Sequence, residues 1–145
     1  MPDRPTIWLV QSDEQRRAQL ASELRDDGMS VLECASTDVA LEAVRKGVKA
    51  AVLVTEPAFG RLTDCELVEQ FQDAAPRLEI IFTPPAGAYA YPTPPGAHVL
   101  VKPFGAGKLS RYIRLVAAKP VLRSVLQGLY RQAKASRAAT SAMAQ

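Results

Sequence analysis

The residues with the greatest potential for chemistry stand at the ends of short apolar runs of the chain or just after them. They are Gln11, Ser12, Asp13, Thr55, Glu56, Thr83 and Lys102. Other reactive types are scarce: the single histidine, His98, leaves a zinc site short of ligands, and the two cysteines provide neither a disulfide framework nor metal-ligand spacing. We therefore expect no metal and no cofactor, and we expect His98 at the surface or at the edge of a loop.

Five apolar runs alternate with helical patterns along the chain. The runs occupy residues 6–10, 29–34, 50–54, 78–83 and 98–101. Strands that alternate with helices indicate βα units, and right-handed crossovers leave few ways to arrange them. The economical fold is an α/β domain with a flavodoxin-like, five-stranded parallel sheet and helices on both faces. In such a sheet the functional site lies outside the carboxyl ends of the strands, where these polar residues fall.

The connection between the fourth and fifth runs departs from this pattern. Residues 84–96 contain five prolines and two glycines, so a regular helix is not expected there. We expect a packed or mobile connector between the two strands. The alternative is a stiff segment that presents Tyr89 and Tyr91 to a partner.

Several motifs, in their order and spacing, resemble the receiver domain of two-component response regulators. The most specific is Val99-Leu100-Val101-Lys102-Pro103-Phe104, and Thr83 and Asp64-Cys65-Glu66-Leu67 add to it. The resemblance covers about residues 5–119 and implies a CheY-like fold and a cytoplasmic role in bacterial signal transduction. It also implies a phosphorylation site, in which an acidic pair after the first strand binds Mg²⁺ and an aspartate at the end of the third strand accepts the phosphoryl group.

At the positions that the resemblance assigns, this phosphorylation site is incomplete. The acidic pair falls on Gln11 and Ser12, which carry no charge, and Asp13 stands one residue later, where capping a helix is the favoured role. The phosphoacceptor falls on Glu56, or on Thr55 after a one-residue shift, and neither is an aspartate. We therefore expect a pseudo-receiver, not an enzyme, that acts through protein contacts without aspartate phosphorylation.

Only Thr83 and Lys102 match the switch hydroxyl and the lysine that the resemblance implies. Glu56 could reach toward Lys102 and mimic the charge of a phosphorylated state, or it could lie in solvent. An alternative function keeps phosphorylation on an unconventional acid, Glu56 or Asp13. Because residues 84–96 replace the fourth helix, the output face that the family uses cannot be assumed here.

Charge divides the chain into two unlike parts. All 15 acidic residues lie in residues 1–79, whereas residues 80–145 contain nine Lys and Arg residues and no acid. This basic half leaves nucleic-acid binding as a less favoured alternative, because few residues remain for a separate binding domain. No apolar run of the sequence is long enough to span a bilayer.

The end of the chain extends beyond a receiver-like domain over residues 1–119. Residues 120–137 have the apolar periodicity of an amphipathic helix. We expect that helix to make a homodimer or partner contact, and the alternative is packing on its own domain. Residues 138–145 predict a disordered tail.

Overall fold

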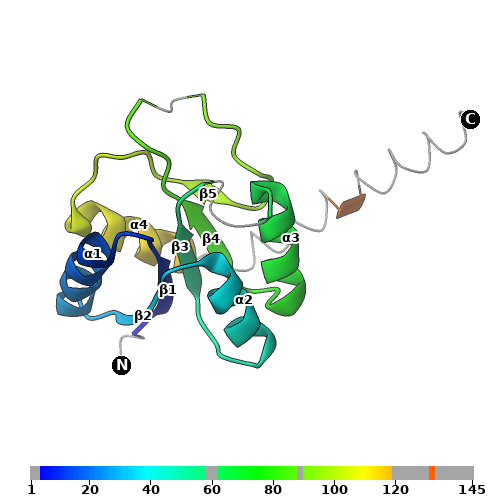
Figure 1. The fold of residues 1–145 in the computed structure, drawn as a ribbon, viewed down its shortest axis with the longest axis horizontal. Helices are drawn as coiled ribbons and strands as arrows, with labels where there is room; N and C mark the ends of the chain where they lie inside the picture. The colour runs from blue at the N-terminus through cyan, green and yellow to red at the C-terminus, as the bar shows by residue number, and fades with distance from the viewer. Residues whose placement is uncertain (1–3, 58–61, 88–89, 119–130, 133–145) are drawn as a thin grey trace, which may run out of the picture.

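The computed structural model describes residues 4–57, 62–87, 90–118 and 131–132 (Figure 1). Five parallel strands form one sheet in the order β2-β1-β3-β4-β5. The strands are β1 (Thr6–Val10), β2 (Ser30–Cys34), β3 (Val52–Thr55), β4 (Glu79–Phe82) and β5 (His98–Val99). The predicted flavodoxin-like sheet is thereby confirmed, although β5 is two residues shorter than the run that predicted it.

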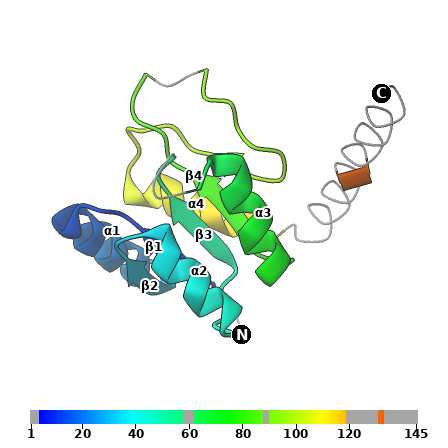
Figure 2. The ribbon, with the colours of Figure 1, turned by 45° about the vertical axis from the view of Figure 1, so that its right-hand side comes forward.

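Helices cover both faces of this sheet (Figures 1 and 2). They are α1 (Glu14–Asp26), α2 (Thr37–Arg45), α3 (Asp64–Ala74) and α4 (Ala106–Ala117). The helices α1 and α4 lie on one face, and α2 and α3 lie on the other. This arrangement explains why the strands are apolar throughout, since successive strand residues point to opposite faces and both faces are covered.

Two apolar clusters form the core, one on each side of the sheet. The cluster under α1 and α4 includes Ile7, Leu9, Val52, Val54 and Ile81, and the cluster under α2 and α3 includes Trp8, Val10, Leu53, Ile80 and Phe82. These ten side chains are at most 7% exposed. Their burial fixes the register of the strands, because a slip of one residue would exchange the two faces.

Polar caps fix where two of the helices begin. The carboxylate of Asp13 accepts the backbone N–H groups of Gln15 and Arg16, at 3.0 and 3.2 Å, and so starts α1 as the sequence predicts. Thr63 and Glu66 form a reciprocal capping box at the start of α3. The cap at Asp13 stands just after the carboxyl end of β1, so it also limits how the chain leaves that strand.

The connector between β4 and β5 forms no helix in its described residues, 84–87 and 90–97. It is packed: Pro84 and Pro94 are buried, and the Gln72 side-chain amide on α3 donates to the carbonyl of Gly96 at 3.2 Å. Tyr91 packs against Phe82 with ring centroids 6.0 Å apart. This is the connector expected from the prolines, whereas Tyr89 lies outside the described residues.

The C-terminal segment lies almost entirely outside the described residues. The expected helix over 120–137 is described only at Arg131 and Gln132, which are helical, and the expected tail over 138–145 is not described. Among the described helices, none combines the length and apolar character that a membrane span requires.

Candidate functional site

The strand order creates a crevice at the carboxyl ends of the sheet. In the order β2-β1-β3-β4-β5 the direction of winding reverses between β1 and β3, which is where open α/β sheets bind ligands. Gln11 follows β1, Glu56 follows β3, Thr83 follows β4, and Lys102 stands three residues after β5. The topology therefore gathers the predicted site residues at one edge.

Glu56 and Lys102 form an ion pair across this edge. The Lys102 Nζ donates to the Glu56 Oε1 at 3.2 Å, and the two side chains are 26% and 29% exposed. Of the two arrangements considered for Glu56, the structure has the contact with Lys102. The contact links the chain after β3 to the chain after β5, and it gives the lysine a resident counter-charge.

Thr55 takes a different position from its neighbour Glu56. Thr55 ends β3 and is fully buried, and its carbonyl accepts the amide of Thr83 at 2.9 Å and the hydroxyl of Thr83 at 3.4 Å. The Thr55 hydroxyl in turn donates to the carbonyl of Glu56 at 3.3 Å. Glu56, not Thr55, therefore presents its side chain to the crevice, and the Thr83 hydroxyl is directed to the neighbouring strand.

Around the end of β1, several polar groups form hydrogen bonds or ion pairs with other groups of the protein. Gln11 is buried, and its carbonyl accepts the Arg17 Nη1 at 2.7 Å. Arg17 also pairs with Glu33, Nε to Oε1, at 3.6 Å. Ser12 is exposed, and the Asp13 carboxylate serves the start of α1. Arg17 was not predicted as a site residue; its place one helical turn after Asp13 was the available signal.

Magnesium, which the resemblance implies, does not fit these residues. It takes hard oxygen ligands in a near-octahedral set, usually including carboxylates. The only carboxylates contributed by the predicted site residues are those of Asp13, which accepts two backbone N–H groups, and Glu56, which is paired with Lys102. In the described part of the chain, no three acidic, histidine or cysteine side chains gather in a way that could hold a metal ion. The Arg17 guanidinium adds positive charge beside Gln11.

An open groove of about 510 Å³ runs beside the ion pair. It lies between α1, the start of the connector and the chain after β5, and Gln11 and Lys102 contribute to its wall. The rest of the lining is Arg16, Gln19, Leu20, Glu23, Pro85, Ala86, Pro103 and Phe104. Its lining combines apolar side chains, such as Leu20 and Phe104, with charged ones, such as Arg16 and Glu23.

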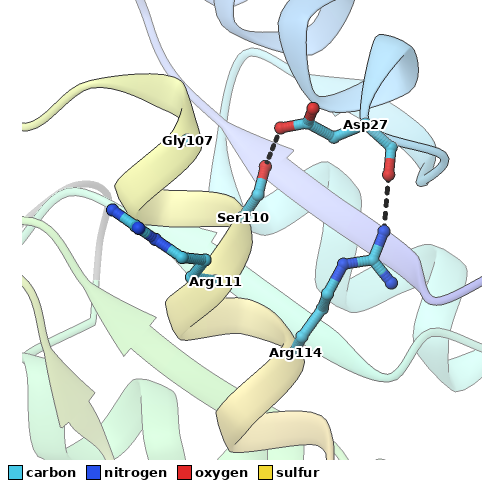
Figure 3. A pocket seen from close by; sticks show the side chains of 5 residues that line it. All are labelled: Asp27, Gly107, Ser110, Arg111 and Arg114. Atoms are coloured by element: carbon cyan, nitrogen blue, oxygen red, sulfur yellow. Dashed lines mark hydrogen bonds between the residues drawn. The ribbon is translucent and has the colours of Figure 1, made fainter.

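A second depression, of about 430 Å³, marks the place where α4 is tied to α1 (Figure 3). The Ser110 Oγ donates to the Asp27 Oδ2 at 2.6 Å, and the Arg114 guanidinium donates to the Asp27 carbonyl. Arg111 points away from Asp27 in this view, and Gly107 completes the lining. These contacts position α4 against the end of α1.

Tyr91 anchors the connector near the carboxyl edge. Its hydroxyl donates to the Asp64 Oδ2, at the start of α3, at 2.6 Å. Burial, and then the hydrogen bond and negative charge of Asp64, raise the pKa of Tyr91 far above its usual value. The phenol therefore stays protonated and donates to Asp64, so this tyrosine ties the connector to the start of α3.

His98 lies at the edge of the loop before β5, as expected, and it also has a partner that the sequence analysis did not foresee. His98 begins β5 and is half-buried, and its Nε2 lies 3.1 Å from the Oε2 of Glu79, whose side chain is 2% exposed. The imidazole also packs edge-on against Tyr112 of α4, with centroids 6.3 Å apart. A carboxylate inside an apolar strand was the signal for this pair, because a buried charge needs a partner.

Comparison with known proteins adds to this geometry. No protein-family model matches the sequence, and no curated protein matches it. Solved structures do match. A response regulator receiver protein from Sinorhizobium medicae WSM419 has a TM-score of 0.70 at 20% identity, covering 83% of this chain and 99% of that one.

Two further receiver structures agree with it. A response regulator receiver domain protein from Clostridium thermocellum has a TM-score of 0.66 at 18% identity, covering 81% of this chain and 98% of that one. A CheY-like receiver domain protein from Methanospirillum hungatei JF-1 has a TM-score of 0.68 at 15% identity, covering 81% and 97%. At these identities the likeness concerns the fold, and the fold of this chain is that of a response-regulator receiver domain.

Proposed function

We propose that this chain is a pseudo-receiver, which acts in cytoplasmic signal transduction through contacts with a protein partner and not through aspartate phosphorylation. The observation that carries the proposal is the ion pair between Glu56 and Lys102, 3.2 Å long, in the crevice where the resemblance implies a phosphoacceptor. No catalytic step is part of the proposal.

The charges of the crevice support this function. In a working phosphorylation site a metal ion and the lysine would neutralise the oxygens of an incoming phosphoryl group. Here Lys102 is neutralised by Glu56, and the positions of the acidic pair carry the uncharged Gln11 and Ser12. An incoming phosphoryl group would therefore meet a carboxylate in place of a free cation.

The same contact favours one fixed conformation. Glu56 holds the chain after β3 to Lys102 after β5, and the Thr83 hydroxyl is bonded to the Thr55 carbonyl. A carboxylate that occupies Lys102 permanently resembles in charge the phosphorylated form that the family reaches only transiently. We infer that the domain presents a constant surface to its partner, including the groove beside Lys102.

The experiment that tests this proposal is an NMR titration of the ¹⁵N-labelled protein with Mg²⁺ and then with beryllofluoride, a phosphoryl analogue. We expect no saturable change in the amide signals of Glu56, Thr83 and Lys102 up to millimolar concentrations. Saturable shifts at these three residues would contradict the proposal, because they would mean that the crevice still accepts the metal and the phosphoryl group.

A variant of the same chain serves as the matched control. Gln11→Asp, Ser12→Asp and Glu56→Asp together restore carboxylates at the positions that the resemblance assigns. We expect this triple variant to respond to Mg²⁺, since hard carboxylate ligands are then present at both strand ends. If the variant responds to Mg²⁺ and the natural protein does not, the difference is due to these three residues.

A further inference from the structure

The end of α3 differs electrostatically from the ends of the other described helices. In α1, α2 and α4 an arginine stands in the last turn, namely Arg25, Arg45 and Arg114. The last turn of α3 contains no basic residue and carries Asp73 instead. Because the C-terminal end of a helix has partial negative charge, an acid there is unfavourable unless a cation lies nearby.

The missing cation comes from the far end of the chain. The Arg131 Nη2 lies 3.0 Å from the Asp73 Oδ1, although the two residues are 58 positions apart in sequence. Their side chains are 56% and 71% exposed, so this pair alone is weak. A stable contact between the segment and α3 therefore requires several such pairs.

Both partners carry the charges for additional pairs. Glu66, Glu69 and Asp73 are exposed and lie three or four residues apart, so they follow one side of α3. On the C-terminal segment, Lys134 and Arg137 follow Arg131 at intervals of three, and the sequence after residue 79 contains no acid. In sequence, therefore, the charged residues of this segment are all positive, whereas those on this side of α3 are negative.

The connectivity favours a contact within one molecule. Ala118, the C-cap residue of α4, lies on one face of the sheet, and Arg131 contacts α3 on the opposite face. The twelve intervening residues can extend to about 40 Å, which is enough to pass from one face to the other. A tethered segment is present at a far higher effective concentration than a second copy in dilute solution.

We propose that the C-terminal segment, residues 119–145, binds the acidic side of α3 in the same molecule, with Arg131 on Asp73 as its anchor. The segment then provides the positive charge that the end of α3 lacks, and it covers Glu69 and Asp73 against basic partners. This inference goes beyond the proposed function and does not depend on it, since the crevice at Glu56 and Lys102 is not involved.

Paramagnetic relaxation in the full chain tests the proposal. Cys65 is exposed on α3 and Cys34 is buried, so a thiol-reactive spin label attaches to Cys65. Asp73 lies eight residues further along the helix, about 12 Å away along its axis. We expect strong broadening of the amide signals around Arg131 in dilute, low-salt solution, and loss of that broadening at high salt, because exposed ion pairs are screened.

Charge reversal provides the matched variants. Glu69→Lys with Asp73→Lys should abolish the broadening, whereas Glu23→Lys with Asp26→Lys, the same change of charge on α1, should leave it intact. The double variant Asp73→Arg with Arg131→Asp exchanges the two charges and should restore the broadening. Recovery would show that the first variant lost the contact and did not simply misfold. Each of these three results supports the contact.

Three results would overturn it. The first is a natural protein without broadening near Arg131. The second is broadening that survives Glu69→Lys with Asp73→Lys. The third comes from a mixture of two samples: ¹⁵N-labelled protein without the spin label, and protein without ¹⁵N that carries the spin label. Equal broadening in this mixture would mean that the segment binds α3 of a second copy of the chain.

Discussion

An acid–base pair at one end of the sheet and another at the opposite end differ in burial. At the amino end of β4 the side chain of Glu79 is 2% exposed and lies 3.1 Å from the imidazole of His98. At the carboxyl ends the side chains of Glu56 and Lys102 are 29% and 26% exposed and lie 3.2 Å apart. The distances are nearly equal, so the difference between the pairs lies in their access to water.

That difference separates a structural pair from a functional one. A carboxylate almost without water is costly unless it is paired, so the fold around Glu79 depends on its contacts. Glu56 and Lys102 keep part of their hydration, so the stability of the fold depends less on this pair. We infer that Glu79 and His98 attach β5 to the sheet, whereas Glu56 and Lys102 set the charge of the crevice.

The largest effect is therefore expected at the buried end. Glu79→Ala should lower the free energy of unfolding by about 3 kcal/mol, since it removes a buried partner and leaves a cavity between β4 and α4. Urea unfolding followed by circular dichroism measures the change. Glu79→Gln keeps the shape of the side chain and should cost less. A loss below about 1 kcal/mol for Glu79→Ala would remove the distinction between the two ends.

Much of the fold was predictable because local signals and burial agree. The apolar runs fix the strands, and Asp13 caps α1 in the structure as the sequence indicates. The strand order then places Glu56, Thr83 and Lys102 at one edge, which follows from topology without any knowledge of side-chain conformation. These are properties of the backbone path.

The rest of the site depends on side chains that meet across the fold. Tyr91 reaches Asp64 over 27 positions, and His98 meets Glu79 over 19. No local pattern encodes such contacts, because they depend on how the connector and β5 pack. The position of His98 after Gly96 and Ala97 correctly indicates a loop edge, but it gives no sign of the partner Glu79 in the neighbouring strand.

A smaller effect, with a distinctive pH dependence, is expected for Tyr91→Phe near the carboxyl edge. Loss of the hydrogen bond to Asp64 should lower the free energy of unfolding by about 1 kcal/mol at neutral pH. Burial, and then Asp64, raise the pKa of Tyr91 in the folded protein, whereas in the unfolded chain the phenol ionises near pH 10. Above about pH 10 the phenol ionises in the unfolded chain but stays protonated in the folded protein. This ionisation stabilises the unfolded chain, so the free energy of unfolding falls as the pH rises above about 10.

The stability advantage of the natural protein over Tyr91→Phe should therefore shrink above about pH 10. Tyr112, whose pKa burial also raises, is present in both proteins, so its contribution cancels in the difference. Urea unfolding at a series of pH values gives the two curves. Parallel curves through this range would mean that burial and Asp64 do not raise the pKa of Tyr91 in the folded protein.

The smallest effect on stability is expected for the crevice pair. Glu56→Gln, Lys102→Met and the double variant form a cycle whose coupling free energy should be about 0.5–1 kcal/mol. The matched control is the cycle of Glu42→Gln and Lys46→Met, an exposed pair on and just after α2 at 3.0 Å, for which about 0.3 kcal/mol is expected. Urea unfolding of all variants measures both couplings.

The amide signal of Thr83 should move in Glu56→Gln, because the carboxylate that holds Lys102 near the end of β4 is lost, and it should not move in Glu42→Gln. Suppose that the coupling free energy is no larger than that of the control cycle, and that the Thr83 amide signal does not shift. Lys102 would then not be paired with Glu56 in solution. The crevice would then expose an unneutralised cation to an anionic ligand, and the phosphorylation-independent function would lose the observation on which it rests. A coupling above the control would instead establish that the less buried of the two pairs still holds the chain after β3 to the chain after β5.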